Sequence, residues 1–212
     1  VSHEWVYQYV LADKASGGKL YTHLRQGKRR YRKGYGQKRG RIPDAVSIEL
    51  RPAIVDERSR LGDWEADLVL GKQGTGAIVT LAERKSRIYL TKKVFSKDAV
   101  EVSNAIISLL SDYRDTCHTI TFDNGLEFSE HKAIAKALEA ECYFAHPYAS
   151  HERGLNENTN GLLRQFIRKG TDLRTVSEED LQRYQSALNS RPRKCLGFRQ
   201  PSVVFAELRK AA

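Results

Sequence analysis

The chain has 212 residues, of which 40% are hydrophobic and 29% charged, a composition typical of a globular protein with one domain and an appendage, or two small domains. No apolar run is long enough to span a bilayer. The first ten residues carry Glu4, where a secretion signal needs a basic start and an apolar core. We therefore expect neither a membrane protein nor a secreted one.

The cysteine and histidine patterns exclude two kinds of stabilisation. Cys117, Cys142 and Cys195 are widely spaced and odd in number, which predicts reduced thiols in a cytosolic protein. The six histidines show no spacing typical of zinc ligands, so we expect no structural zinc site.

The net charge of +10 is concentrated in one short segment. Residues 25–41 hold nine cations and no acid, which leaves +1 for the other 195 residues. Clustered cations bind favourably where they displace the counterions of a phosphate backbone. The segment therefore predicts an extended basic arm that binds nucleic acid, with a solvated linker or a targeting-type patch as the alternatives. The cations are Arg25, Lys28, Arg29, Arg30, Arg32, Lys33, Lys38, Arg39 and Arg41.

The patterns along the chain divide it into three regions. Residues 1–24 have apolar residues at helical spacing, with Ser2 as the expected N-cap. Residues 25–57 combine the basic arm with a connection that contains two prolines. Residues 58–212 alternate between strand and helix patterns, which predicts one α/β domain.

The third region predicts a mixed five-stranded sheet with helices on its faces, because three strands in a meander are followed by alternating helices and strands. Serine N-caps are expected at Ser96 and, in a capping box with Asp180, at Ser177. The expected strands are residues 64–70, 77–81, 88–94, 118–122 and 142–145, and the expected helices are residues 97–113, 130–140, 155–169 and 177–190.

Three carboxylates occupy separate elements of this domain, as in an active site assembled on a compact sheet. Asp67 lies in a strand, Asp123 at the end of another strand, and Glu157 near the start of a helix. Oxygen-rich sites of this type bind magnesium or manganese. Periodicity alone does not separate Asp67 from Asp63 and Glu65, which share its strand face.

Each carboxylate also has a purely structural interpretation. Asp123 begins an Asp-Asn-Gly sequence that is common in turns, and the helix dipole favours an acid at the position of Glu157. Helical spacing places Glu157 in one row with Gly161, Arg164 and Arg168, and such a row suits a metal ligand beside a nucleic-acid backbone.

The motifs around the three acids resemble a known family. Asp67 ends R-x-x-x-G-D-W-E-x-D, in which Trp64 stands three residues before it; Asp123 lies in T-F-D-N-G-x-E-F, and Glu157 lies in E-R-G-x-N-E-N-x-N-G-L-L-R-Q-F. S-H-E-x-V-Y-x-Y stands near the start of the chain and R-P-R-K-x-L-G near its end. Taken together, and in the order in which they follow one another along the chain, the five motifs resemble those of the bacterial insertion sequence 30 family of transposases. The three acids are similar to the DDE triad of transposases and retroviral integrases.

This resemblance covers nearly the whole chain and implies a ribonuclease H-like integrase catalytic core in residues 58–212. It implies that Asp67, Asp123 and Glu157 are the catalytic residues and the ligands of two Mg²⁺ or Mn²⁺ ions. The implied reaction is phosphodiester hydrolysis at transposon ends, followed by attack of the exposed 3′-hydroxyl on target DNA. Residues 2–10 resemble only the final helix of the family's helix-turn-helix region, so residues 1–24 are expected to be a remnant of the N-terminal DNA-binding region.

The resemblance also implies partners and contacts. Double-stranded DNA and further copies of the chain are the implied partners, in the cytoplasm of a bacterium at its nucleoid, without a membrane. His146 and His151 are expected in the loop that overhangs the metals, where either would assist proton transfer or contact the scissile strand, although such histidines are more often plain surface residues. Arg191, Arg193 and Lys194 have the pattern of a solvated turn, with DNA contact as the alternative. The DNA contacts expected outside the arm are Arg153, Asn156, Asn160, Arg164 and Arg168.

Two rival functions are compatible with these residues. One is a catalytically idle DNA-binding remnant or repressor of transposition, which a missing N-terminal region favours. The other is a metal-dependent nuclease of the same fold that acts on RNA–DNA hybrids, which competition between hybrid and duplex DNA would reveal. The intact triad favours the active transposase.

Overall fold

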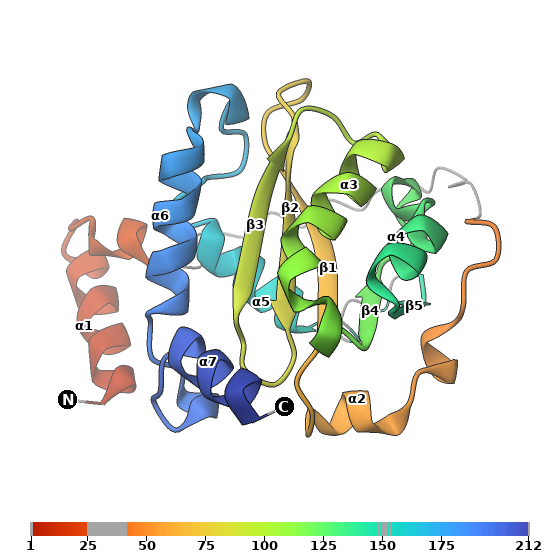
Figure 1. Ribbon diagram of the computed structural model, residues 1–212. Coiled ribbons are helices and arrows are strands. Elements are labelled where there is room, and N and C mark those ends of the chain that lie inside the picture. Colours follow the sequence, from red (N-terminus) through yellow and green to blue (C-terminus); the bar gives the residue numbers. More distant parts are fainter. Residues whose placement is uncertain (1, 25–41, 148, 150–151, 153, 212) are drawn as a thin grey trace. The chain divides into compact units, whose positions relative to one another are not determined.

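Five strands form one mixed sheet in the computed structural model, which describes residues 2–24, 42–147, 149, 152 and 154–211 (Figure 1). Their spatial order is β3-β2-β1-β4-β5; β1 to β3 form an antiparallel meander, and β4 and β5 continue the sheet in parallel with β1. The predicted α/β class and the predicted mixed sheet are therefore confirmed. The strands are β1 (Asp63–Leu70), β2 (Ala77–Glu83), β3 (Tyr89–Val94), β4 (Thr119–Phe122) and β5 (Glu141–Phe144).

The chain consists of two compact units, Val1–Lys38 and Arg39–Ala212. In the first unit, helix α1 (His3–Ala15) is followed by the 3₁₀ helix η1 (Leu20–His23). The Ser2 hydroxyl accepts a hydrogen bond from the backbone N–H of Trp5 at 3.2 Å, so the predicted N-cap is confirmed. All nine cations of the predicted basic arm lie outside the described residues, and the predicted division of the chain at residues 24 and 57 stays a prediction.

In the second unit, helices cover both faces of the sheet (Figure 1). α3 (Ala99–Leu110) and α4 (His131–Leu138) pack on one face, and α5 (Gly154–Leu163) and α6 (Glu178–Asn189) pack on the other. The short α2 (Ala53–Glu57) precedes β1, and α7 (Pro201–Ala211) follows α6. The 3₁₀ helices are η2 (Ile48–Leu50), η3 (Ser111–Thr116), η4 (Leu126–Phe128), η6 (Leu173–Thr175) and η7 (Lys194–Leu196).

The alternation of β1 explains how one strand serves both a core and a polar site. Trp64 and Ala66 point into the core beneath α3 and α4, and Trp64 is only 1% exposed, against the rings of Tyr113 and Phe205. The residues that alternate with them, Asp63 and Glu65, point to the opposite face because side chains alternate along a strand. Burial of the apolar set fixes the register, and the register carries the acids to the α5 side.

One predicted helix start is wrong. The helix expected from residue 97 with Ser96 as its cap begins at Ala99, and Asp98 is its N-cap. The Asp98 carboxylate accepts hydrogen bonds from the backbone N–H groups of Val100 and Glu101 at 3.0 and 3.2 Å. Both serine and aspartate are good N-caps, so residue type could not decide between positions two residues apart.

One predicted helix end is also wrong. α5 stops at Leu163, whereas the sequence pattern extends to residue 169. After Leu163 the backbone N–H groups of Gln165 and Phe166 bond to carbonyls three residues earlier, each at 3.0 Å, so the chain tightens into turns. The backbone N–H of Arg164 still donates to the carbonyl of Asn160 at 2.9 Å, as in a helix, whereas Arg168 lies beyond the turns and does not continue a helical row from Glu157.

In the C-terminal part, one predicted N-cap is confirmed and one helix is present that the sequence pattern did not predict. The Ser177 hydroxyl accepts from the backbone N–H of Asp180 at 3.0 Å, so α6 begins at its predicted N-cap. The sequence pattern predicts neither α7 nor the short α2. No described helix has the length and apolar character needed to cross a membrane.

All three cysteines are free thiols, as predicted. Cys117 and Cys142 are buried in the core, and burial raises the pKa of each thiol to about 12. Both thiols are therefore protonated at neutral pH and serve as packing groups. Cys195 is exposed.

Candidate active site

Three acidic side chains of β1 point to the α5 side of the sheet, and their partners separate them. Asp63 and Glu65 are buried, and each is paired with an arginine: Arg60 donates to Asp63 at 2.9 Å, and Arg84 donates to Glu65 at 2.6 Å. Asp67 is half-buried, further along the strand. The sequence period alone did not separate the three acids. Asp63 and Glu65 form buried ion pairs that stabilise the fold, which favours Asp67 as the candidate catalytic residue.

Asp123 directly follows β4, the parallel neighbour of the strand that carries Asp67. β1 and β4 are parallel neighbours in which Glu65 is paired with Thr121, so Asp67 and Asp123 each stand two residues further along. Alternation continued past Phe122, the last residue of β4, predicts the same face for both side chains. Asp123 also forms the turn that its sequence predicts, because its carboxylate accepts from the backbone N–H of Gly125 at 2.8 Å. The turn and a catalytic role are compatible, since the carboxylate stays half-buried at the edge of the sheet.

Glu157 is exposed in the first turn of α5, as the sequence predicts. The helix packs on β1 and β2, so it lies over the strand that carries Asp67. An acid in the first helical turn also interacts favourably with the helix dipole. The fold therefore brings the element that carries Glu157 to the face of the sheet on which Asp67 lies.

A side-chain amide connects α5 directly to Asp67. Asn160 donates from its Nδ2 to the Asp67 carboxylate at 2.8 Å, and its Oδ1 accepts from the Tyr89 hydroxyl at 2.7 Å. The Tyr89 ring is fully buried between the sheet and the helices, and burial raises its pKa, so the hydroxyl stays a donor. Tyr89 thus holds the Asn160 amide in one orientation, and Asn160 holds the Asp67 carboxylate.

Tyr89 was not predicted from the sequence to belong to a site. It stands on β3, 71 residues from Asn160, and its core position looks like that of any apolar ring. The buried hydroxyl at the start of a strand was the available signal, because a buried tyrosine hydroxyl normally has a partner.

The donor chemistry of the three acids fits a hard divalent cation, since carboxylate oxygens are the ligands that Mg²⁺ and Mn²⁺ prefer. In the part of the chain that the structure describes, no three Asp, Glu, His or Cys side chains are close enough to hold one metal ion. The structure therefore places β4, which Asp123 follows, and α5, which carries Glu157, next to β1 with Asp67, and it does not assemble the three carboxylates into one ligand set.

Among the predicted DNA contacts, Asn156 does not fit its expected role. Its side chain is fully buried, and its backbone N–H donates to Glu65 at 3.1 Å, so it faces the inside of the protein. Arg164 is half-buried, and its guanidinium donates to the backbone carbonyl of Leu70 at 2.7 Å. Arg168 is exposed beyond the end of α5. Arg153 lies outside the described residues.

His146 is held by two carboxylates next to the predicted site. Its Nδ1 lies 2.8 Å from Glu152, and its Nε2 lies 3.3 Å from Glu49. These acids, Glu152 above all, raise the pKa of the imidazole. Because the pKa of His146 is raised, its ion pairs with the two carboxylates stabilise the fold fully below the unfolded-state pKa. This stabilisation is lost as the pH rises through the folded-state pKa. His151 lies outside the described residues.

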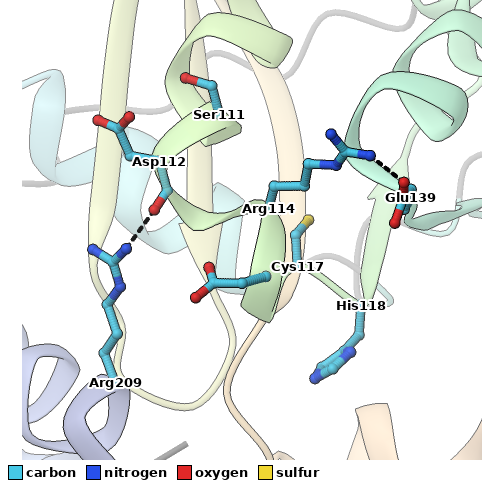
Figure 2. A pocket seen from close by; sticks show the side chains of 8 residues that line it. Ser111, Asp112, Arg114, Cys117, His118, Glu139 and Arg209 are labelled. Carbon is cyan, nitrogen blue, oxygen red and sulfur yellow. Dashed lines mark hydrogen bonds and ion pairs between the residues drawn. The ribbon is translucent and has the colours of Figure 1, made fainter.

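A separate cavity of about 600 Å³ lies at the other end of β4 (Figure 2). Figure 2 shows two arginines at its rim, each with a hydrogen-bond partner: Arg114 with Glu139, and Arg209 with the backbone carbonyl of Asp112. His118, which lines the cavity, directly precedes β4, whereas Asp123 directly follows the last residue of that strand. None of the predicted catalytic residues lines this cavity.

Comparison with known sequences identifies relatives over nearly the whole chain, although no protein-family model matches it. The chain is 43% identical over 210 residues to the transposase for insertion sequence element IS4351 of Bacteroides fragilis and 38% identical over 216 residues to that for IS1086 of Cupriavidus metallidurans. Each match covers 98% of this chain but only 64% and 63% of the relatives' own lengths. The transposase InsI for element IS30A of Escherichia coli is 37% identical over 86% of this chain and 47% of its own length.

Solved structures agree on the fold. The catalytic core domain of BIV integrase superposes with a TM-score of 0.53 at 20% identity, over 70% of this chain and 96% of that domain. A chain of the simian T-cell lymphotropic virus intasome superposes with a TM-score of 0.57 at 16% identity, over 69% of this chain and 54% of its own. The described sheet and helices thus have the ribonuclease H-like fold of retroviral integrase catalytic cores, and over nearly its whole length the chain is related to the transposases of insertion sequence 30-type elements.

Proposed function

We propose that this chain is a DNA transposase that hydrolyses phosphodiester bonds at transposon ends and joins the resulting 3′-hydroxyl to target DNA. One observation carries the proposal: Asp67 lies on β1 and Asp123 directly follows β4, its parallel neighbour, in an integrase-like fold whose sequence relatives are transposases. The chain spans 64% of the first of those relatives, and the proposal concerns the reaction of the core.

The roles of the residues follow from their chemistry. Asp67, Asp123 and Glu157 would hold two divalent ions through their carboxylate oxygens, with Mg²⁺ or Mn²⁺ as the fitting metals. Two such ions stabilise the attacking and leaving oxygens of an in-line phosphoryl displacement. Asp67 contributes a carboxylate whose orientation is set in advance, because Asn160 donates to one of its oxygens. Preorganised ligands of this kind need little rearrangement when substrate binds.

Asn160 is a positioning residue in this proposal, held in turn by Tyr89. We expect Asn160→Ala to lower the rate of DNA cleavage by about 10- to 100-fold, because removal of a partner that orients a metal ligand has effects of that size. Tyr89→Phe, which removes only the hydroxyl, should give a smaller decrease. The measurement is the single-turnover cleavage rate as a function of Mg²⁺ concentration.

The matched control for that prediction is Asn104→Ala, since Asn104 is an exposed asparagine of α3 on the other face of the sheet. It should leave both the rate and the Mg²⁺ dependence unchanged. A merely structural role for Asn160 would lower the melting temperature without moving the Mg²⁺ concentration at half-maximal rate, and that outcome would contradict the assignment.

Duplex DNA is the proposed partner, and the basic arm is its proposed main contact. Replacing Arg29, Arg30, Arg32 and Lys33 by alanine should weaken DNA binding. It should also flatten the dependence of log affinity on log salt by about 0.9 for each phosphate that the variant no longer binds. Fluorescence anisotropy over a range of salt concentrations measures both. An unchanged slope would make the arm a linker, whereas the active-site proposal would be untouched.

The test of the function is cleavage and joining of a labelled duplex that carries the parent element's end, with Mg²⁺ or Mn²⁺. Products that disappear in Glu157→Gln would support a working transposase core. DNA that is bound but never cut, even with Mn²⁺, would favour the idle remnant or repressor instead. Preferred cleavage of an RNA–DNA hybrid in competition would favour the nuclease.

Assembly and location follow as further parts of the proposal. Joining two transposon ends requires at least two active sites on one DNA complex, so we infer a homo-oligomer on DNA. We further infer that the reaction takes place in the bacterial cytoplasm, on nucleoid DNA; relatives that are transposases of bacteria support this inference.

A further inference from the structure

The loop between α6 and α7 holds an exposed aromatic ring among cations. Residues 191–199 contain four basic residues and no acid. The side chain of Phe198 is 71% exposed, although burial is the usual fate of a phenylalanine. The basic residues are Arg191, Arg193, Lys194 and Arg199.

The backbone at Phe198 is held in a conformation that disfavours a bulky residue. Its φ is +63°, in the left-handed region that suits glycine, and the preceding Gly197 has a φ of +62°. The backbone N–H of Phe198 donates to the carbonyl of Arg193 at 2.9 Å, and that of Arg193 donates to the carbonyl of Arg199 at 3.0 Å. These bonds fix the strained turn. Strain of this kind is concentrated at functional positions.

Phe198 therefore does not stabilise the fold: its ring packs in no core, and its backbone conformation is strained. A glycine would satisfy the turn at no steric cost, and a polar residue would suit the exposure. A phenylalanine at this position is explained by a contact made outside the chain. The loop presents the ring rigidly, so little conformational freedom disappears when it binds.

The arginines of the loop are also held in place. Arg191 donates to the Gln165 side chain at 3.1 Å, Arg193 donates to the Leu188 carbonyl at 3.0 Å, and Arg199 pairs with Glu207. Lys194 is exposed at the tip. The loop thus offers positive charge in a fixed arrangement around one protruding ring.

The base of the loop is joined to the sheet that carries Asp67. The Asn189 side chain accepts from the backbone N–H of Tyr89 at 2.9 Å and donates to the backbone carbonyl of the same residue at 2.8 Å. α6 ends at Asn189, directly before the loop. A ligand held by the loop is therefore held at a fixed position relative to β3 and to the Tyr89–Asn160–Asp67 contact.

We propose that residues 191–199 form a DNA-binding loop in which the cations contact phosphates and the Phe198 ring stacks on a base. Exposed aromatic rings in a basic setting bind nucleic acid in this way, because every base presents a π-face that can stack on the ring. A rigid apolar ring fits a base that is unpaired or at a strand end, where no unstacking is needed. The inference rests on the proposed function in one respect, that DNA is the partner.

The test compares binding to a labelled duplex with a short single-stranded overhang, measured by anisotropy on the full chain without divalent metal. Phe198→Gly should weaken binding by about fivefold or more, because the loss of one stacked base corresponds to about 5- to 150-fold. Its melting temperature should stay equal to that of wild type or rise, because glycine relieves the positive φ. Phe198→Trp should keep the affinity.

Two further variants separate the parts of the proposal. Lys194→Ala should reduce the salt slope by about 0.9, in agreement with one phosphate contact. Phe95→Ala is the matched control, because Phe95 is an 83% exposed phenylalanine between β3 and α3 outside the loop. It should bind the overhang duplex as wild type does.

Three outcomes would overturn the inference. If the wild-type chain binds and cleaves DNA and Phe198→Gly binds it with unchanged affinity, the loop contact is refuted and the transposase proposal stays intact. An equal decrease in Phe95→Ala would show that any exposed ring has the same effect. Dissociation of an oligomer by Phe198→Gly at constant DNA affinity, seen by sedimentation, would assign the ring to a second copy of the chain.

Discussion

Replacing Asp67 by asparagine is expected to lower the rate of DNA cleavage by about 10³-fold or more while leaving DNA affinity nearly unchanged. The substitution keeps the shape of the side chain and removes its negative charge, so one proposed metal ligand is removed. Removal of groups that only orient a ligand already costs about 10- to 100-fold, and removal of the ligand itself should exceed that. Asp123→Asn and Glu157→Gln are expected to behave alike.

The measurement is cleavage of the element's end under single-turnover conditions, with anisotropy for DNA affinity and a thermal melt for folding. Asp115→Asn is the control, because Asp115 is an exposed aspartate in η3, near the opposite end of β4. It changes the net charge by the same amount and should cleave at the wild-type rate. A triad variant that retains cleavage within tenfold of wild type would remove that residue from the proposed site.

Replacing Arg84 by methionine is expected to lower the free energy of unfolding by about 3–5 kcal/mol, because it would leave the buried Glu65 carboxylate without its cationic partner. Arg84 is 4% exposed and Glu65 1% exposed, and their charged atoms are 2.6 Å apart. The same guanidinium donates to the backbone carbonyl of Val55 at 3.0 Å and pairs with Asp56 at 3.1 Å. One side chain therefore joins α2 to the sheet.

Urea denaturation measures this effect, and a second substitution tests its cause. Adding Glu65→Gln to Arg84→Met removes the uncompensated charge, so most of the stability should return. Arg114→Met is the matched control, since Arg114 pairs with Glu139 where both side chains are more than half exposed. Exposed ion pairs contribute little, and the control should unfold close to wild type. A double variant no more stable than Arg84→Met would mean that packing, not charge, is what Arg84 provides.

The strands were predictable because their side-chain environments repeat locally. Trp64 and Ala66 alternate with acids, and this period of two is visible in eight residues without any knowledge of the partners. The end of α5 was not predictable, because the local apolar pattern does not stop where the helix stops. Ile167 is buried beyond the helix, so the apolar pattern continues through turns that are no longer helical.

Contacts between distant elements carry no local signal, and the site depends on them. The sequence motifs select Asp67, but nothing near Asn160 indicates that its amide turns inward to that carboxylate instead of outward to DNA. Asn156 looks like an equivalent polar residue of the same motif, yet it is fully buried. Which residues of a polar helix face inward depends on the sheet beneath it.

The paired acids of β1 also protect the protein against misfolding. If β1 were to slip by one residue against β2, Asp63, Glu65 and Asp67 would enter the apolar layer beneath α3 and α4, and Trp64 would face outward. Three carboxylates would be separated from Arg60, Arg84 and Asn160 at once. The slipped pairing is therefore penalised by charge burial as well as by poorer packing. The residues that position Asp67, the proposed metal ligand, thus also exclude the alternative sheet in which it would be buried.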